Sequence, residues 1–181
     1  MRKTFFRYYT IADYEDEEIW LREQHRTGWK LVSMTPPGFY VFESCMPEDV
    51  IYRLDYKNSE QSEEYLQMMQ DFGWEYFEHC FGWLYFRKPA AEVNSEEEGE
   101  LFSDPESRVD MVNRIVQTRM LPIAVIFLCC VLPNLIQAIN GNLSVYSGFF
   151  GGFFGVMFVL YMYIIIHSGI KLKQIRDRYR K

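Results

Sequence analysis

Few side chains in this sequence are suited to catalysis or metal binding, and none of them stands in a catalytic pattern. His25, His79 and His167 are far apart, and the cysteines show no CxxC spacing, so the ligands of a zinc site do not come together. The sequence contains no nucleophile–histidine–acid set, phosphate-binding loop, glycine-rich dinucleotide turn or His-Glu-x-x-His motif. We therefore expect no enzyme, no metal site and no cofactor.

Two groups of residues in the first half of the chain are candidates for a ligand or partner face. Arg53 and Asp55 are two positions apart in a predicted strand, so they project from the same face, where a cross-strand salt bridge is the simpler interpretation. Trp29, Trp74 and Trp83 either line such a face or fill the core of a small domain. The chain has 13 Tyr and 15 Phe, more than one sheet face can bury, so we expect some on an exposed docking surface.

A weak internal repeat predicts the elements that carry these residues. Each copy has a strand, an amphipathic helix that ends at Gly28 or Gly73, and a hairpin of two strands. The expected helices are 13–27 and 59–72, and the expected strands are 4–10, 29–34, 39–43, 50–56, 74–79 and 83–87. A duplicated β-α-β-β unit predicts a ferredoxin-like, two-layer α+β domain, in which an antiparallel sheet of about six strands carries both helices on one face.

The run from Met120 to Ile170 contains no Asp, Glu, Lys or Arg and predicts a membrane insert. Its two apolar blocks, 121–139 and 146–170, each approach the roughly 20 residues that a helix needs to cross a bilayer. A transmembrane helical hairpin follows, because only closed helices satisfy backbone polar groups in lipid. The lipid bilayer is therefore an expected partner.

Basic residues on both sides of this insert predict its orientation. Arg114 and Arg119 precede the first span, and the connecting loop has no basic residue, so both termini are expected in the cytoplasm of a multi-pass cell-membrane protein. A basic tail follows the second span, and we expect it to contact the anionic inner leaflet: Lys171, Lys173, Arg176, Arg178, Arg180 and Lys181. The net charge of −6 and the acidic first part argue against nucleic acid as a ligand.

Two segments connect the predicted domain to the predicted hairpin. The first, 90–103, is acidic and cannot bury enough apolar surface to order itself, which predicts a linker. The second predicts an amphipathic helix that lies at the membrane surface or continues into the first span. The expected organisation is a domain at 1–89, a linker at 90–103, a juxtamembrane helix at 104–119, a transmembrane hairpin at 120–170 and a basic tail at 171–181.

Small and polar residues inside the predicted spans indicate a packing surface. Four glycines form a stripe on which another helix can pack closely: Gly148, Gly151, Gly152 and Gly155. On the first span, Asn134 is expected near the depth of Gly152, and Gln137 near the depth of Gly148. Their amides either bond to the glycine stripe, within the hairpin or across a dimer, or form a lone polar pair near the outer leaflet.

Several short motifs of the first 89 residues occur together. They are the pairs Gly28-Trp29 and Gly73-Trp74, the strand Tyr52–Tyr56 and the closing run Gly82–Pro89. In this combination residues 3–89 resemble a bacterial family of unknown function, DUF2812. The resemblance implies a cytoplasmic domain followed by membrane spans, and gene neighbourhoods that contain PadR-type transcription regulators. It implies no catalytic residues.

These patterns favour a membrane-anchored cytoplasmic module that binds or regulates, and that recognises a protein or a small ligand at the inner membrane face. The alternative is a structural or assembly subunit that acts through its transmembrane hairpin. A protein partner or self-association is expected in both cases. An enzyme acting on a membrane-associated substrate is disfavoured, because the sequence offers no set of acid, base and nucleophile.

Overall fold

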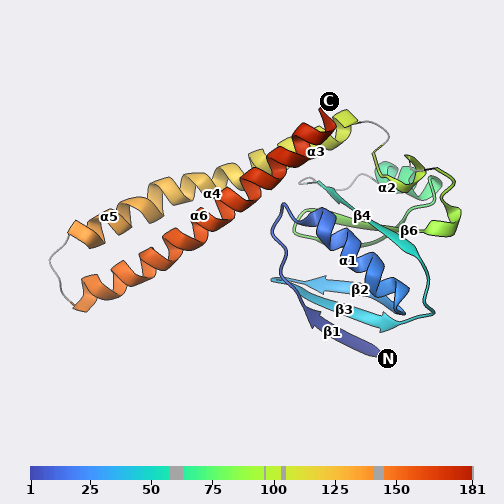
Figure 1. Ribbon diagram of the computed structural model, residues 1–181, viewed down its shortest axis with the longest axis horizontal. Helices are drawn as coiled ribbons and strands as arrows, with labels where there is room; N and C mark the ends of the chain where they lie inside the picture. Colours follow the sequence, from blue (N-terminus) through green and yellow to red (C-terminus); the bar gives the residue numbers. More distant parts are fainter. Residues whose placement is uncertain (58–62, 96, 103–104, 141–144, 181) are drawn as a thin grey trace.

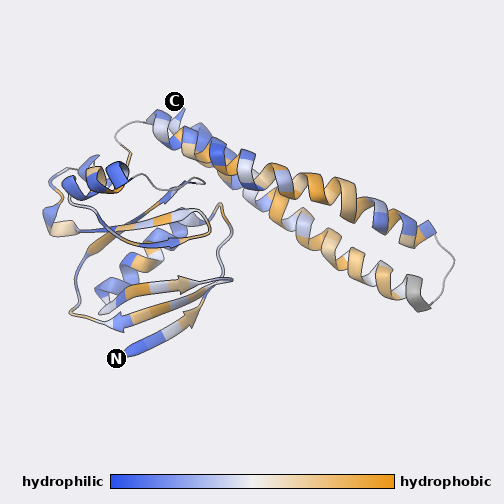
Figure 2. Ribbon diagram, turned by 180° about the vertical axis from the view of Figure 1, so that it is seen from behind, coloured by the Kyte–Doolittle hydropathy of each residue, from blue (hydrophilic) through white to orange (hydrophobic). Residues whose placement is uncertain are grey.

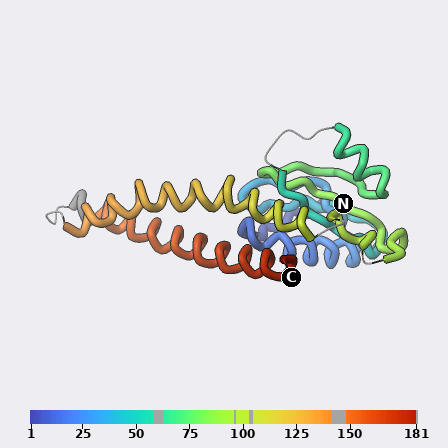
Figure 3. The backbone as a smooth tube through the Cα atoms, turned by 90° about the horizontal axis from the view of Figure 1, so that it is seen from above, coloured from blue at the N-terminus to red at the C-terminus, as the bar shows by residue number. Residues whose placement is uncertain are grey.

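The structure is a computed structural model that describes residues 1–57, 63–95, 97–102, 105–140 and 145–180. It consists of an α+β domain and two long helices that lie side by side and extend away from it (Figure 1). The N-terminus and the C-terminus are both at the domain end, and the view from above shows the helices projecting in one direction (Figure 3). The two helices therefore form a hairpin whose open end meets the domain.

The domain contains the predicted helices and strands in the predicted order. They are β1 (Arg2–Phe6), α1 (Tyr14–Arg26), β2 (Trp29–Thr35), β3 (Phe39–Ser44), β4 (Val50–Tyr56), α2 (Glu63–Asp71), β5 (Glu75–Cys80) and β6 (Trp83–Pro89). Gly28 and Gly73 follow the two helices with φ of 88° and 82°. This left-handed backbone favours glycine and confirms where both helices end. The first part of the predicted second helix, 59–62, lies outside the described residues.

The strands form two three-stranded antiparallel sheets instead of the single six-stranded sheet that the sequence predicted. The strand orders are β1-β3-β2 and β4-β6-β5. β2 and β5 lie next to each other but share no hydrogen-bonded ladder, and each has a register shift, at Leu31/Ser33 and at Tyr76/Glu78. Such irregularities bend a strand and interrupt its pairing. The two halves share one strand order, while a ferredoxin-like duplication stays a prediction.

The two helices of the domain lie on opposite faces of the second sheet, so the prediction that they share one face is wrong. Side chains alternate along a strand: Tyr85 of β6 belongs to the core cluster that contains Leu21 of α1, whereas Leu84 and Phe86 belong to a second cluster with Met69 of α2. α1 contacts both β2 and β4. It therefore covers parts of both sheets.

The first long helix is continuous from Pro105 to Asn140. Of the two predicted alternatives, a separate surface helix or one that continues into the first apolar segment, the structure has the second. It consists of α3 (Pro105–Ile115), a π turn (Val116–Met120), α4 (Leu121–Ile126), a second π turn (Phe127–Val131) and α5 (Leu132–Asn140). Each π turn ends two residues before a proline, Pro122 or Pro133. A proline ring clashes with the carbonyl four residues earlier, and the wider turn makes room for it.

The second long helix is α6 (Val145–Tyr179). The segments Pro105–Asn140 and Gly148–Tyr179 are long and apolar enough to cross a membrane, with a mean hydropathy of 2.2 in the most apolar window of each. The apolar residues concentrate in the part of the hairpin that projects beyond the domain (Figure 2).

The open end of the hairpin packs into the domain core. Its buried side chains belong to the same cluster as Leu54 and Tyr56 of β4: Met111, Val112, Ile115, Leu172 and Ile175. Each of these five is at most 1% exposed. Helix α3 and the C-terminal part of α6 therefore contribute to the domain's hydrophobic core.

The acidic linker is more ordered than its composition predicted. Its described residues include two short 3-10 helices, at Ala90–Glu92 and Glu97–Gly99. Leu101 is buried in the cluster of α2, and Phe102 packs against it. The prediction missed this because two apolar residues at the end of an acidic run are enough to anchor it.

Replacing Ile175 by alanine tests the packing of the hairpin end. We expect Ile175→Ala to lower the free energy of unfolding by about 2–5 kcal/mol, because it leaves a cavity in the shared core. Ile170→Ala is the matched control on the same helix, since Ile170 is 54% exposed. Denaturant unfolding of the detergent-solubilised full chain measures both, and equal losses would contradict the shared core.

Candidate functional site

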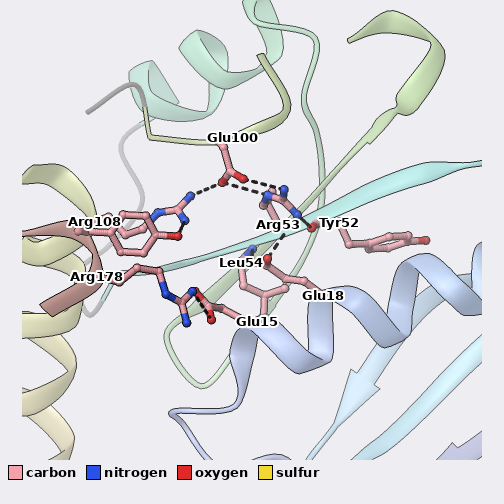
Figure 4. Close-up of polar contacts among 9 residues, drawn as sticks. Glu15, Glu18, Tyr52, Arg53, Leu54, Glu100, Arg108 and Arg178 are labelled. Carbon is pink, nitrogen blue, oxygen red and sulfur yellow. Dashed lines mark hydrogen bonds and ion pairs between the residues drawn. The ribbon is translucent and has the colours of Figure 1, made fainter. Parts of the chain in front are cut away.

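A cluster of charged side chains lies where α1, β4, the linker, α3 and the end of α6 meet (Figure 4). We call it the junction cluster, and it consists of Glu15, Glu18, Arg53, Glu100, Arg108, Arg178 and Tyr179. Its members come from α1, β4, the linker, α3 and α6. The cluster therefore joins the domain and the linker to both long helices.

Arg53 is at the centre of the junction cluster. Its guanidinium donates to both carboxylate oxygens of Glu100, at 3.2 Å from Nε and 2.9 Å from Nη2. Nη1 donates to Glu18 at 3.4 Å and to the carbonyl of Tyr52 at 3.0 Å. The predicted cross-strand salt bridge of Arg53 is thus wrong. Its partners come from α1 and the linker, which lie beside the strand in space but far from it in sequence.

Glu18 is buried, and its carboxyl group bonds to the edge strand of the second sheet. Its Oε1 accepts a hydrogen bond of 2.8 Å from the backbone N–H of Leu54 in β4, an edge strand. Burial raises the pKa of Glu18 to about 8, and the charge of Arg53 opposes that rise. The carboxyl group satisfies an edge amide that has no neighbouring strand.

Arg108 and Arg178 extend the cluster to both long helices. Arg108 of α3 donates to Glu100 and to the hydroxyl of Tyr179, and Arg178 of α6 donates to both oxygens of Glu15 at 3.2 Å. A groove of about 720 Å³ runs beside the cluster, and Arg53, Glu100, Arg108 and Tyr179 line part of it. Because the charged side chains already pair with one another, we interpret the cluster as a structural contact that holds domain, linker and hairpin together, and not as a ligand site.

A second group of ion pairs fastens α6 to the start of α1. Lys171 Nζ lies 2.5 Å from Asp13 Oδ1 and also pairs with Asp16, while His167 Nε2 lies 3.1 Å from Asp13 Oδ1. Burial acts to raise the pKa of Asp13, but hydrogen bonds from Lys171 and Thr10 outweigh it and lower the pKa to about 2. Asp13 is therefore ionised at neutral pH and attracts the cation on α6.

The basic tail, which the sequence predicted to face lipid, is divided between two environments. Lys171 and Arg178 pair with acidic residues of α1. Lys173 and Arg180 are exposed, and Arg176 is half-buried with its guanidinium 3.8 Å from Asp177. Lys181 lies outside the described residues. The charges of the acidic helix start and the basic tail were complementary in the sequence, and that signal could have predicted their pairing.

A cavity of about 280 Å³ lies on the other side of α1, between the domain and the two long helices. We call it the junction cavity. Glu17 lines it and is buried, and its Oε1 accepts hydrogen bonds from the hydroxyls of Tyr40 at 2.9 Å and Tyr85 at 2.8 Å. Burial raises the pKa of Glu17 to about 7, against the effect of these hydrogen bonds. Glu17 was not among the predicted site residues, because it stands in the acidic first turn of a helix, where carboxylates are ordinary helix-start residues.

The three tryptophans that were candidates for a binding face have mainly structural surroundings. Trp74 is buried in the cluster of α2, and Trp29 lies half-buried at the edge of the first sheet with Lys3 over its ring. Trp83 is buried against Tyr14 and Tyr56, and it also lines the junction cavity. Only Trp83 therefore contributes to a cavity at the junction.

Asp55, the second strand candidate, is fully buried between α2 and α3. Tyr65 donates to its Oδ2 at 2.7 Å, and Lys57 and Arg114 lie 3.9 Å and 4.0 Å from its carboxylate oxygens. Burial raises its pKa above the usual value, and these three groups oppose the rise. Asp55 and Arg53 thus share a strand, as predicted, but contact different partners from outside the sheet.

The predicted packing residues of the hairpin do not come together within it. Asn134 donates to the carbonyl of Cys130 in its own helix at 2.6 Å, and Gln137 is exposed. A Cβ added to Gly148, Gly152 or Gly155 would meet no atom of the described residues within 4 Å, whereas one at Gly151 would lie 3.5 Å from Ala138. The amides therefore do not bond to the glycine stripe within one hairpin, and pairing across a dimer stays a prediction.

Comparison with known proteins supports one assignment. Residues 13–126 match the family described as "Protein of unknown function (DUF2812)". The chain belongs to this family. The DUF2812 match includes Arg53, Glu100 and Arg108 of the junction cluster, and it extends past the linker into the first long helix. No curated protein and no solved structure matches the chain.

Neutralising Lys171 tests the attachment of α6 to α1. We expect Lys171→Gln to destabilise the chain by on the order of 1 kcal/mol, and to speed hydrogen exchange in the first turn of α1. Lys173→Gln is the matched control, because Lys173 has no ion pair within the described residues. Hydrogen exchange measured by mass spectrometry on the full chain in detergent compares them. Equal protection in both variants would contradict the attachment.

Glu17 gives the stability of the domain a specific pH dependence. Its carboxyl titrates near 4.5 when unfolded and near 7 when folded, so the folded state holds the proton longer and its stability falls as pH rises through that interval. We expect Glu17→Gln to remove a loss of at most about 3 kcal/mol between pH 5 and pH 8. Thermal unfolding at both pH values measures it, with the exposed Glu23→Gln as control. Identical pH dependence in wild type and Glu17→Gln would contradict it.

Proposed function

We propose that this DUF2812 protein is a membrane-anchored cytoplasmic module that binds or regulates. Its α+β domain recognises a protein or small ligand at the inner membrane face, and its helical hairpin crosses the bilayer twice and holds the domain there. Both termini lie in the cytoplasm. The uncharged run of the hairpin and the basic residues that flank it support this orientation.

One observation carries the proposal: the base of the hairpin is part of the domain's core. Met111 and Ile115 of the first long helix and Leu172 and Ile175 of the second are buried in the same cluster as the strands. A ligand that shifts the packing of the domain must therefore act on both long helices, because they share its contacts. Such coupling requires only that the ligand binds one arrangement of these contacts better than another.

The internal symmetry of the domain belongs to the same proposal. We infer that its halves derive from duplication of one ferredoxin-like β-α-β-β unit. The equivalent strand orders, β1-β3-β2 and β4-β6-β5, and the equivalent glycines that end α1 and α2 support this.

Cysteine labelling tests the orientation. In a chain without its native cysteines, Ser95→Cys should react with a membrane-impermeant maleimide only after the cells are lysed, because it is expected on the cytoplasmic side. Asn140→Cys at the far end of the hairpin should react in intact cells. Labelling of Ser95→Cys in intact cells, or recovery of the full chain in the soluble fraction without detergent, would refute the anchoring.

The alternative function, a structural or assembly subunit acting through its hairpin, is favoured by the outward glycines. Gly148 and Gly152 offer a surface on which a helix from another chain can approach closely, since nothing described lies within 4 Å of their added Cβ atoms. Photocrosslinkers distinguish the two functions. Partners trapped from the sheets favour the binding module, and partners trapped only at Gly148 or Gly152 favour the assembly subunit.

Enlarging Gly152 tests this surface directly. Gly152→Leu fits within a single hairpin, so we expect it to lower self-association or partner retention without lowering the melting temperature of the domain. Val125→Leu, on the first long helix at a position that is 50% exposed, is the control for added bulk away from the glycine stripe. Sedimentation in detergent measures the mass of each variant. Unchanged assembly of Gly152→Leu would argue against the assembly subunit.

A further inference from the structure

The junction cavity contains polar groups that the described protein leaves without partners. The hydroxyls of Tyr9 and Ser168 are buried and have no hydrogen-bond partner within the described residues, and both residues line the cavity. Glu17 also lines it, and its Oε2 accepts no hydrogen bond from the described residues, because both tyrosines donate to Oε1. Native proteins rarely leave buried polar groups unpaired. Two such hydroxyls, beside a carboxylate oxygen that accepts no hydrogen bond from the described residues, therefore point to a ligand.

The walls of the junction cavity are otherwise mainly apolar. They come from the domain and from both long helices, and they include Ile11, Met34, Pro36, Trp83, Ile123 and Ile164. The charged Arg119 also lines the cavity, and its guanidinium donates to the hydroxyl of Tyr56 and to the carbonyl of Phe81. At about 280 Å³ the cavity is at the small end of ligand pockets, which span roughly 300–1,000 Å³. A two-chain lipid does not fit such a volume, whereas one short alkyl chain does.

The position of the cavity indicates where the ligand comes from. Ile123 and Ile164 lie inside the uncharged run of the chain, so the wall that they form borders the expected membrane surface. Tyr8 and Phe81, two aromatic residues lining the cavity, are 58% and 62% exposed. Exposed aromatic rings beside membrane spans are typical of the lipid–water interface. An amphiphile dissolved in the bilayer would meet this side of the protein first.

We propose that the junction cavity binds a single-chain amphiphile with a hydrogen-bond-donating head, a primary amine or alcohol, which enters from the bilayer. The head donates to Glu17 Oε2 and contacts the hydroxyls of Tyr9 and Ser168, and the alkyl chain fills the apolar part between the domain and the two helices. Bound there, the ligand touches Glu17 of α1, Ile123 of the first long helix and Ile164 of the second. This inference deepens the proposed function by naming its ligand class, and it rests on that function for the membrane route.

Tryptophan quenching tests the proposal on the full chain in phosphatidylcholine nanodiscs. All four tryptophans lie outside the predicted spans, and Trp83 alone among them lines the junction cavity, so a probe bound there lies next to Trp83. A terminally brominated short-chain alcohol and the matching amine should quench the fluorescence of Trp83 saturably at pH 8. The matching carboxylic acid should quench more weakly, because Glu17 repels its charge and the guanidinium of Arg119 is already bonded to Tyr56 and to the carbonyl of Phe81.

Two matched variants locate the bound probe. Ile164→Phe fills the cavity, and we expect it to weaken quenching by the alcohol about tenfold. Ile166→Phe makes the same change at a position on α6 that is 50% exposed. The probe should quench the fluorescence of this variant as strongly as that of the wild type. Glu17→Gln should remove any preference for the amine over the alcohol. A thermal melt of each variant establishes that it is folded.

Defined outcomes would overturn the proposal. Equal quenching in Ile164→Phe and Ile166→Phe, quenching by the acid as strong as by the alcohol, or quenching that rises without saturation would each show that the cavity is not the site. These results leave the orientation test unaffected, so the cavity can fail while the membrane-anchored module stands. Saturable binding by a chain that needs no detergent would instead retain the cavity and refute the anchoring.

Discussion

The hydrogen bonding of the buried Glu17 carboxylate is the interaction on which the arrangement of the α+β domain depends. Tyr40, one of its donors, belongs to the first sheet, and Tyr85, the other, belongs to the second. The two sheets share no ladder, so α1 joins them, with Leu21 packing into the core and Glu17 bonding to both sides. An unpaired buried carboxylate is costly. The position of α1 across the sheets is therefore held by a group that must keep its hydrogen bonds.

The same helix also attaches the hairpin, through its other acidic residues. Asp13, Glu15 and Asp16 at its start pair with Lys171 and Arg178 of α6. The first turn of α1 thus forms ion pairs with α6 on one side, while Glu17 forms buried hydrogen bonds with the two sheets on the other. A structural consequence is that domain and hairpin cannot move independently at this point without exchanging charged partners. The junction cavity lies beside these contacts, where small shifts of α1 would change its shape.

Much of the local structure was predictable because its causes are local. Gly28 and Gly73 end α1 and α2 because those positions need a left-handed backbone, and β4 spans the predicted residues. The element order and the two long apolar helices also agree with the prediction. Ile19 is an apolar residue of the amphipathic helix α1, yet its side chain is 66% exposed. Hydrophobic periodicity predicts only which apolar residues face the core. It therefore does not predict that a carboxylate such as that of Glu17 is buried.

By itself, the sequence determined the type and order of the elements, the ends of α1 and α2, the uncharged run and the family of the domain. These depend on backbone preferences and on the spacing of apolar residues, which act over a few positions. Only the tertiary structure decided that the sheet is split, that α2 takes the opposite face, and that Arg53 pairs with Glu100 instead of a neighbouring strand. It also decided the burial of Glu17. Each of these depends on which distant segments meet, and that is set by the packing of the whole chain.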